Sequence, residues 1–305
     1  MYFPYFRGRM YELLALKELV ADGKLSNSII PIIEPIKLTS TFNNLLTTFD
    51  AADHKLAIVY NPEVGDLSDS SDGIELMDNN CVIPSILVNK SAISTVAALK
   101  SQGIQEKDIL AVLNKRDFIE TYQTLFDTDS PKYTIASKDR QILRKAKSPK
   151  VLFDDKFSKR EKNADYLKED DEFFSEDHLY YSEEGFEGFG DYSIIGNEYN
   201  EGGFAPRAVA IHIVYFAKNN ELRIHHFVSD SNFDISDVAG KFNEAVLKLQ
   251  KWYSSQSEIQ LTYALQLLLN HAEEGTYPGL PTIKKLSMMH HMELIGKYLG
   301  GSKKG

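Results

Sequence analysis

The stretch SILVNK, from Ser85 to Lys90, is an apolar run that ends on an amide followed by an ammonium group. The same ending recurs in Ala111–Lys115, Thr134–Lys138 and Val151–Lys156, where Asn, Ser or Asp precedes the Lys. Continuous apolar runs, unlike alternating ones, are typical of parallel strands that helices cover on both faces. The four runs therefore predict consecutive strands of one parallel sheet, each ending on polar residues.

Helical segments separate these runs, so the chain alternates between strand and helix. Residues 91–103 begin near Ser and end on Gly, and 116–126 and 139–146 begin at or near Asp, as helices between strands do. Further strand-like runs occupy 29–36, which we take as the first strand, and 55–62. At least six such units in order favour an α/β fold of the (β/α)8, TIM-like barrel type over an open doubly wound sheet. No GxGxxG turn follows the first strand, which removes the usual dinucleotide-binding signature.

The regular pattern stops after Phe157. Residues 158–188 are acidic and aromatic, and we expect a long insertion there that serves as a lid or a partner-binding loop. Strand-like runs follow, of which 189–196 and 208–216 are predicted as the seventh and eighth barrel strands and 221–230 as the hairpin partner of the latter. Helical periodicity then covers 234–253, 259–275 and 281–300. We therefore expect a barrel that is irregular in its second half over residues 1–230, with C-terminal helices of residues 231–305 packed on it.

Charge and composition limit the classes of function. The net charge is −10, and the segment from Asp154 to Glu201 accounts for it, with 16 acidic and 5 basic residues. General binding of duplex nucleic acid is disfavoured by this balance. One cysteine, Cys81, gives no disulfide framework, and no run is long enough to span a membrane. The N-terminus lacks a secretory signal pattern, so we expect a cytoplasmic protein.

Several motifs resemble an uncharacterised family of bacterial and phage proteins called beta proteins. They are YFPYFRGRMYELLAL near the start, IIPIIEPI at residues 29–36, GFGDY at 188–192 and GLPTIKKLSMMHHMEL near the end. The resemblance covers most of the chain, and it implies a barrel-like α/β fold and a link to mobile-element or phage-defence loci. It brings no established catalytic residues.

The polar residues at the strand ends are the candidate site, because the carboxyl ends of parallel strands lie on one face, where ligands bind. The candidate catalytic carboxylates are Glu34, Asp154, Asp155 and Asp191. The candidate ligand-binding residues are Asn61, Asn89, Lys90, Asn114, Lys115, Lys138, Lys156, the first-helix residues Arg7 and Arg9, and His212 from the predicted eighth strand. Because side chains alternate along a strand, we expect Asn89, Asn114 and one of Asp154 and Asp155 to point toward the barrel axis.

These residues allow two interpretations. Asn, Ser and Asp also cap helices and begin loops, but Lys caps no helix N-terminus and is disfavoured there by the helix dipole. Repeated Lys therefore favours a positively charged mouth that binds an anionic ligand. The carboxylates can also hold Mg²⁺, a candidate cofactor.

The first hypothesis is thus a barrel protein that binds a phosphorylated or nucleotide-like ligand and, if it is an enzyme, hydrolyses a phosphoester with metal assistance. The alternative is a non-catalytic recognition subunit that binds an operon-encoded protein partner in a defence system. His290 lies on the apolar stripe of the last helix, where a hydrogen-bonded core histidine is favoured over a metal ligand.

Overall fold

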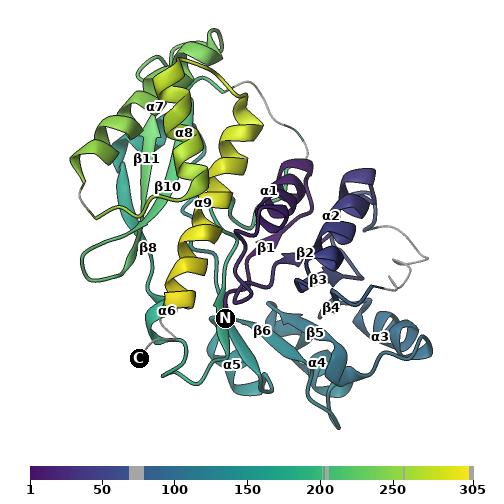
Figure 1. Ribbon diagram of the computed structural model, residues 1–305. Coiled ribbons are helices and arrows are strands. Elements are labelled where there is room, and N and C mark those ends of the chain that lie inside the picture. The colour runs from purple at the N-terminus through teal and green to yellow at the C-terminus, as the bar shows by residue number, and fades with distance from the viewer. Residues whose placement is uncertain (69–78, 201, 203–205, 257, 302–305) are drawn as a thin grey trace. The chain divides into compact units, whose positions relative to one another are not determined.

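Eight parallel strands form one sheet in the part of the chain that the structure describes (Figure 1). The computed structural model describes residues 1–68, 79–200, 202, 206–256 and 258–301. In sheet order the strands are β1 (Tyr5–Phe6), β2 (Ile32–Ile33), β3 (Leu56–Val59), β4 (Val82–Leu87), β5 (Leu110–Leu113), β6 (Tyr133–Ser137), β7 (Lys150–Phe153) and β9 (Gly188–Gly190). The amide of Phe3 donates to the carbonyl of Phe189, and that of Tyr5 to Asp191, each at 2.8 Å, which joins β9 back to β1. The sheet therefore closes into a barrel, and the predicted (β/α)8-type fold is confirmed.

Helices connect most of the barrel strands. They are α1 (Met10–Ala21), α2 (Ser40–Ala51), α3 (Ala92–Ser101), α4 (Ile119–Leu125), α5 (Arg140–Lys145) and the single-turn α6 (Asp177–Tyr180), with short 3-10 turns η1 (Glu106–Asp108) and η2 (Arg116–Phe118). Asp139 accepts hydrogen bonds from the amides of Gln141 and Ile142, so it caps α5 as its position in the sequence predicts. Thr39 caps α2 through the amide of Phe42. Ser91, in contrast, makes no side-chain cap on α3.

The barrel interior is apolar along most of its length. Its buried cluster contains Phe3, Tyr5, Ile30, Ile32, Ala57, Val59, Ile83, Leu87, Leu110, Val112, Ile135, Val151, Phe153 and Tyr192. Most of these residues are two positions apart on their strand, which is the alternation expected for one side of a sheet. The barrel is therefore a packed core and not a pore.

The structure corrects the strand count of the barrel. The first strand is β1, Tyr5–Phe6, whereas the sequence took 29–36 as the first strand and assigned no element to these two residues. The run at 208–216, predicted as the eighth barrel strand, is β10 (Ala210–Phe216) and belongs to a separate antiparallel sheet. A two-residue strand is too short to give a periodic signal, so counting apolar runs shifted the barrel register by one strand.

The described chain divides into two compact units at the end of β7. The first comprises Met1–Asp155 and Asp177–Tyr192, and the second Lys156–Glu176 and Ser193–Gly305. The sequence assigned everything before residue 231 to the barrel, whereas the structure groups residues 156–176 and 193–230 with the C-terminal helices. The reason is strand pairing, because β8 (Asp171–Ser175) from the acidic insertion pairs with β11 (Leu222–Val228).

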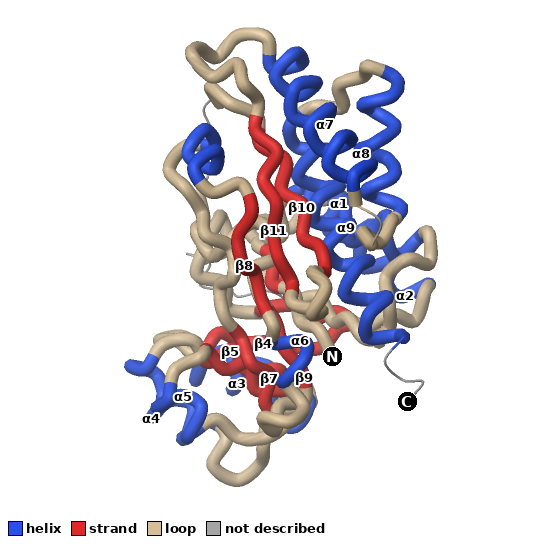
Figure 2. The backbone as a smooth tube through the Cα atoms, turned by 90° about the vertical axis from the view of Figure 1, so that its left-hand side faces the viewer, coloured by secondary structure: helices blue, strands red, loops and turns tan. Residues whose placement is uncertain are grey.

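The second unit combines a three-stranded antiparallel sheet with helices (Figure 2). Its strand order is β10-β11-β8, and β10 and β11 form the predicted hairpin. Its helices are α7 (Val238–Ser255), α8 (Tyr263–Glu274) and α9 (Leu280–Gly301), with the 3-10 turn η3 (Asn163–Lys168) in the insertion. Residues 158–176 of the insertion are thus part of this unit, where they supply β8 to its sheet and bury Tyr166 and Phe174, while residues 177–188 belong to the first unit. No helix of the described residues is long and apolar enough to cross a membrane.

His290 holds α9 against both the sheet and α8. Its Nε2 lies 2.7 Å from the carbonyl oxygen of Val214 and its Nδ1 2.7 Å from Oγ1 of Thr262, the residue that caps α8. The carboxylate of Glu293 accepts from the amides of Tyr263 and Ala264 at the same helix start. A negative charge there is favourable because of the helix dipole. The predicted core histidine is thereby confirmed.

Burial makes the stability of this unit depend on pH. It lowers the pKa of His290 to about 4, against about 6.5 for an unfolded histidine. Between these values the unfolded chain binds a proton that the folded chain does not. The free energy of unfolding should therefore decrease as pH falls from about 6.5 to about 4, by up to ~1.4 kcal/mol per pH unit for one such group. We expect His290→Gln to reduce that slope in urea unfolding measured across this range, and an unchanged slope would contradict the assignment.

Candidate functional site

A ring of polar side chains closes the carboxyl end of the barrel interior. On seven strands, the residue two positions after the last apolar residue of the interior is polar, and alternation places it on the same side of the sheet. These residues are Arg7, Glu34, Asn61, Asn89, Asn114, Ser137 and Asp155, and Tyr192 completes the set from β9. We call these eight residues the polar ring. The change from apolar to polar occurs on seven of the eight strands, so it belongs to the barrel end as a whole and not to one loop.

Glu34 is the buried centre of one side of the polar ring. Its side chain is 0% exposed, and its Oε2 accepts hydrogen bonds from Arg7 Nη1 and from Tyr5 Oη, the latter at 2.6 Å. Its Oε1 accepts from the backbone amide of Glu63 at 2.7 Å. Burial and the charge of Glu34 raise the pKa of Tyr5 well above its ordinary value, so Tyr5 is a neutral donor. Charge-assisted bonds of this kind are about twice as strong as neutral ones.

The guanidinium group of Arg7 is held in place by aromatic rings as well as by charge. Its Cζ lies 5.3 Å from the ring centroid of Tyr5 and 5.7 Å from that of Tyr192. Burial acts to lower the pKa of Arg7, but its interactions with Tyr5, Glu34 and Tyr192 outweigh that effect and raise it. Arg7 is therefore a fixed cation at this end of the barrel.

Tyr192 joins the other side of the polar ring to Arg7. Burial raises the pKa of its hydroxyl to about 12, with Arg7 opposing the shift and Glu34 and Asp155 adding to it. The side chain of Asn114 hydrogen-bonds the same hydroxyl. Asp155, whose charge acts on this interior hydroxyl, is thus the member of the Asp154–Asp155 pair that belongs to the ring, while Asp154 falls on the other side of the strand.

Two of the predicted ligand-binding amides have structural bonds of their own. Asn61 donates to the carbonyl of Leu87 and accepts from its amide, each at 2.8 Å, so its side chain extends the pairing of β3 with β4. Oδ1 of Asn89 accepts from Asn61 at 2.9 Å and from the amide of Ser91 at 3.0 Å. The Nδ2 group of Asn89 reaches Glu63 at 3.2 Å. The side chain of Asn61 therefore serves to join two strands, as expected if polar strand ends are structural. Asn89 in addition contacts the charged side chain of Glu63.

An ion pair lies at the rim of the polar ring. Nζ of Lys115 is 2.7 Å from Oε2 of Glu63, and both side chains are more than a third exposed. An exposed pair contributes at most about 1 kcal/mol, so it can open at little cost. Lys115 is therefore able to exchange Glu63 for an anionic group of a ligand.

The other lysines do not share one cluster. Lys90 is exposed, and Lys138 lies 3.9 Å from Asp177. Lys156 belongs to the second unit. Each follows a residue that points inward, so alternation turns it outward. For Lys90, Lys138 and Lys156 the polar–Lys ending thus indicates an inward polar residue followed by an outward lysine, so Lys115 is the lysine of the four that lies at the rim of the polar ring.

Three further predicted residues lie outside the polar ring. Asp191 is next to the inward-facing Tyr192 and accepts a hydrogen bond of 2.7 Å from the hydroxyl of Tyr2, so it faces the other side of the sheet. Arg9 is the N-cap residue of α1, where its amide donates to Glu12. His212 is on β10 in the second unit, because the strand that carries it is not a barrel strand.

Tyr5, Glu63 and Tyr192 were missed by the sequence. Tyr5 was missed because β1 was not recognised as a strand. Tyr192 follows the predicted Asp191, and the alternation of Gly188, Gly190 and residue 192 on one side was the available signal. No local pattern marks Glu63, which lies in the loop after β3.

The described residues hold no group of three or more His, Cys, Asp or Glu side chains placed to bind a metal ion. Glu34 is occupied by Arg7 and Tyr5, and Asp191 by Tyr2. Asp155 is the second carboxylate of the polar ring.

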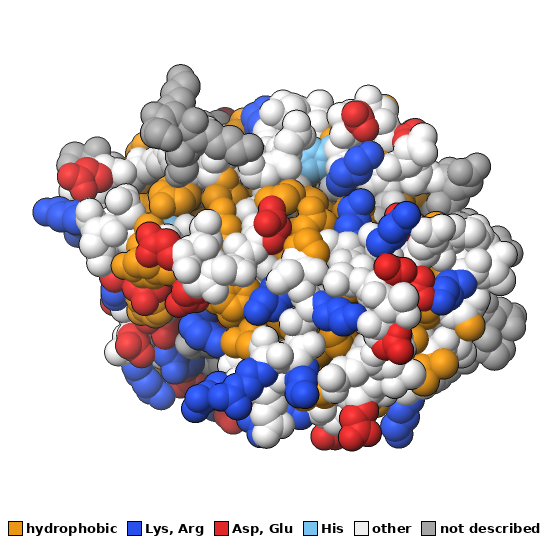
Figure 3. Space-filling model, turned by 90° about the horizontal axis from the view of Figure 1, so that it is seen from below, with side chains coloured by type: hydrophobic (Ala, Val, Ile, Leu, Met, Phe, Trp, Pro, Cys, Tyr) orange, Lys and Arg blue, Asp and Glu red, His pale blue; other side chains and the backbone are white. Residues whose placement is uncertain are grey.

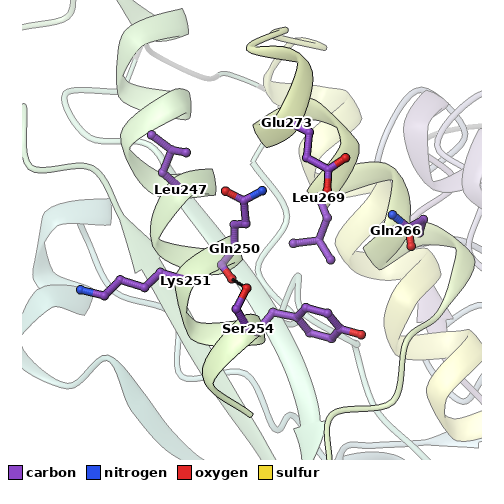
Figure 4. A pocket seen from close by; sticks show the side chains of 8 residues that line it. Leu247, Gln250, Lys251, Ser254, Gln266, Leu269 and Glu273 are labelled. Atoms are coloured by element: carbon purple, nitrogen blue, oxygen red, sulfur yellow. Dashed lines mark hydrogen bonds between the residues drawn. The ribbon is translucent and has the colours of Figure 1, made fainter. Parts of the chain in front are cut away.

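A surface pocket in the second unit is a separate feature. It has a volume of about 360 Å³ and lies between α7 and α8, as Figure 4 shows. Its lining comprises Leu247, Gln250, Lys251, Tyr253, Ser254, Gln266, Leu269 and Glu273, none of which the sequence suggested.

On the face of the molecule in Figure 3, basic side chains lie among acidic and apolar ones. The charge on that face is mixed in sign.

No protein-family model, no curated protein and no solved structure matches this chain.

Proposed function

We propose that the polar ring is the ligand site of this protein and that the ligand is a small phosphorylated or nucleotide-like molecule. The observation that carries the proposal is the change from apolar to polar side chains at the carboxyl end of the barrel interior. Sites of (β/α)8 proteins lie at this end. Membership of the beta-protein family, with its link to phage-defence or mobile-element loci, is part of the same proposal.

Two cations, one in the ring and one at its rim, suit a phosphate group joined to a polar body. Lys115 supplies a cation that an exposed carboxylate can release, and Arg7 supplies a second, fixed cation. Asn89 and Asn114 offer amides, and Tyr192 offers a neutral hydroxyl, for the uncharged part of the ligand. A phosphate would thus replace Glu63 as the partner of Lys115, with charge-assisted hydrogen bonds.

Asp155 is the residue that we assign to phosphoester hydrolysis. A carboxylate at the edge of the ring is able to orient water as a general base. Mg²⁺ commonly binds through one or two carboxylates together with substrate phosphates, so Asp155 and the ligand would be sufficient to hold it.

Ligand binding should depend on Lys115 and turnover on Asp155. We expect a nucleotide or sugar phosphate to raise the melting temperature, and Lys115→Gln to weaken its affinity about tenfold or more, as loss of a charged hydrogen bond of roughly 1.5–3 kcal/mol implies. Asp155→Asn should preserve binding and lower hydrolysis by about 10²- to 10⁴-fold. A thermal-shift screen with divalent ions, followed by calorimetry and phosphate release, measures these effects.

Lys55→Gln is the matched control. Lys55 immediately precedes β3, at the amino end of the barrel, and its Nζ donates to the carbonyl of Asn80. The Lys55→Gln variant should bind the ligand with unchanged affinity. An equal loss of affinity in both variants would show a nonspecific charge effect, and full affinity in Lys115→Gln would place the ligand elsewhere.

Failure of every ligand to stabilise a folded sample would favour the second candidate, a non-catalytic recognition subunit. That function is supported by apolar side chains exposed in the second unit, where Phe173 on β8 is 49% exposed and Phe233 before α7 is 89% exposed. Scattered exposed apolar residues are ordinary, so the ligand site remains the preferred function.

A further inference from the structure

Two histidines and a carboxylate form a hydrogen-bonded chain in the second unit, away from the polar ring. His212 on β10 and His226 on β11 are register partners, and their Nδ1 atoms lie 2.7 Å apart. Nε2 of His226 is 3.1 Å from Oε1 of Glu172 on β8. The other oxygen of Glu172 is 3.0 Å from Nη2 of Arg160. The chain thus runs across all three strands of the sheet.

The positions of the protons follow from the partners. Burial raises the pKa of Glu172, but the charge of Arg160 opposes that shift, and the ion pair keeps the carboxylate an acceptor. Nε2 of His226 must then carry a proton. Burial lowers the pKa of His226 to about 4, so the ring is neutral and its Nδ1 carries a lone pair. That lone pair can accept only from an Nδ1–H group of His212.

A neutral His212 with its proton on Nδ1 has its lone pair on Nε2. That atom makes no hydrogen bond to any described residue, and His212 is partly exposed, whereas His226 is 2% exposed. The rings of Phe157 and Tyr166 border His212 at centroid distances of 5.2 and 4.8 Å. The positive charge of Lys284 also acts on His212. An oriented lone pair, two neighbouring aromatic rings and the charge of Lys284 therefore occur together.

We propose that Nε2 of His212 is a hydrogen-bond-accepting site for a hydroxylated aromatic ligand, with His226 and Glu172 as positioning residues. The ligand hydroxyl donates a hydrogen bond to Nε2. The Nδ1–H group of His212 remains bonded to His226, which Glu172 orients. Burial lowers the pKa of His212 well below its ordinary value, so the ring stays neutral and keeps this lone pair as an acceptor.

The ring tautomers test the first half of this proposal. Long-range ¹H–¹⁵N NMR spectra of the 305-residue protein with ¹⁵N-labelled histidine, assigned with His212→Gln and His226→Gln, identify the protonated nitrogen of each ring. We expect the Nδ1–H form for His212 and the Nε2–H form for His226 at pH 7.5. In Glu172→Gln the His212 ring should lose its single tautomer. The Nε2–H form of His212 in the unsubstituted protein would overturn the proposal.

Titration with phenol tests the second half. We expect the Nε2 resonance of His212 to shift on addition of phenol and not of toluene, which has the ring but no hydroxyl. The signals of His290 serve as an internal control, because both of its ring nitrogens are occupied by Val214 and Thr262. An equal response to phenol and toluene, or none at His212, would overturn the assignment, even if the polar ring binds its own ligand as proposed.

Discussion

Replacing Glu34 by Gln should destabilise the barrel by about 3 kcal/mol, the lower end of the range for breaking a buried ion pair. The amide keeps the shape and can still accept the amide proton of Glu63, but it leaves the charge of Arg7 without its partner. The lower end applies because the Arg7 side chain is 18% exposed and lies over the Tyr5 and Tyr192 rings. Urea unfolding at pH 7 measures the change.

A double-mutant cycle separates the ion pair from the loss of a side chain. Arg7→Met and Glu34→Gln together should cost clearly less than the sum of the two single substitutions, because neither charge is then left unpaired. Lys115→Gln, which breaks the exposed pair with Glu63, should change stability by less than about 1 kcal/mol. Additive single effects, or a Glu34→Gln cost as small as that of Lys115→Gln, would show that the buried pair is not important for stability.

Gly190→Ala should also cost about 3 kcal/mol, the upper end for overpacking. A Cβ at this position would meet the backbone carbonyl oxygen of Phe3 and would lie 2.9 Å from Cδ2 of Phe153. The carbonyl belongs to the backbone just before β1, at the closure of the barrel, and cannot rotate away as a side chain would. The clash is relieved only if β1 and β9 move apart. We therefore expect unfolding at a lower urea concentration, with a similar dependence of the unfolding free energy on urea.

Gly300→Ala is the matched control. Gly300 is near the end of α9, and a Cβ there would meet no heavy atom within 4 Å. Alanine is the better helix former by up to about 1 kcal/mol, so this variant should be neutral or slightly more stable. A Gly190→Ala protein as stable as Gly300→Ala would contradict the close approach of β1 to β9.

The barrel was predictable from the sequence because its signals are local. Apolar runs such as 81–90 and 108–115 mark buried parallel strands wherever they pair, and alternation then identifies the inward residue after each run. Asn89 and Asn114 were predicted in this way, together with one of Asp154 and Asp155. Asp191 was misplaced although its strand was recognised, because the side of the sheet depends on a register that one apolar run does not fix.

The sequence by itself determined the fold class, the order of the central strands and helices, and the polar carboxyl ends of those strands. Each of these rests on propensity and periodicity within about ten residues. The tertiary structure alone decided that Tyr5–Phe6 is a barrel strand, that Asp171–Ser175 pairs with Leu222–Val228, and that Arg7, Glu34 and Tyr192 meet. Each of these features brings together residues that are far apart in the chain. They depend on how the barrel closes and on the register of its strands, and neither closure nor register produces a local pattern in the sequence.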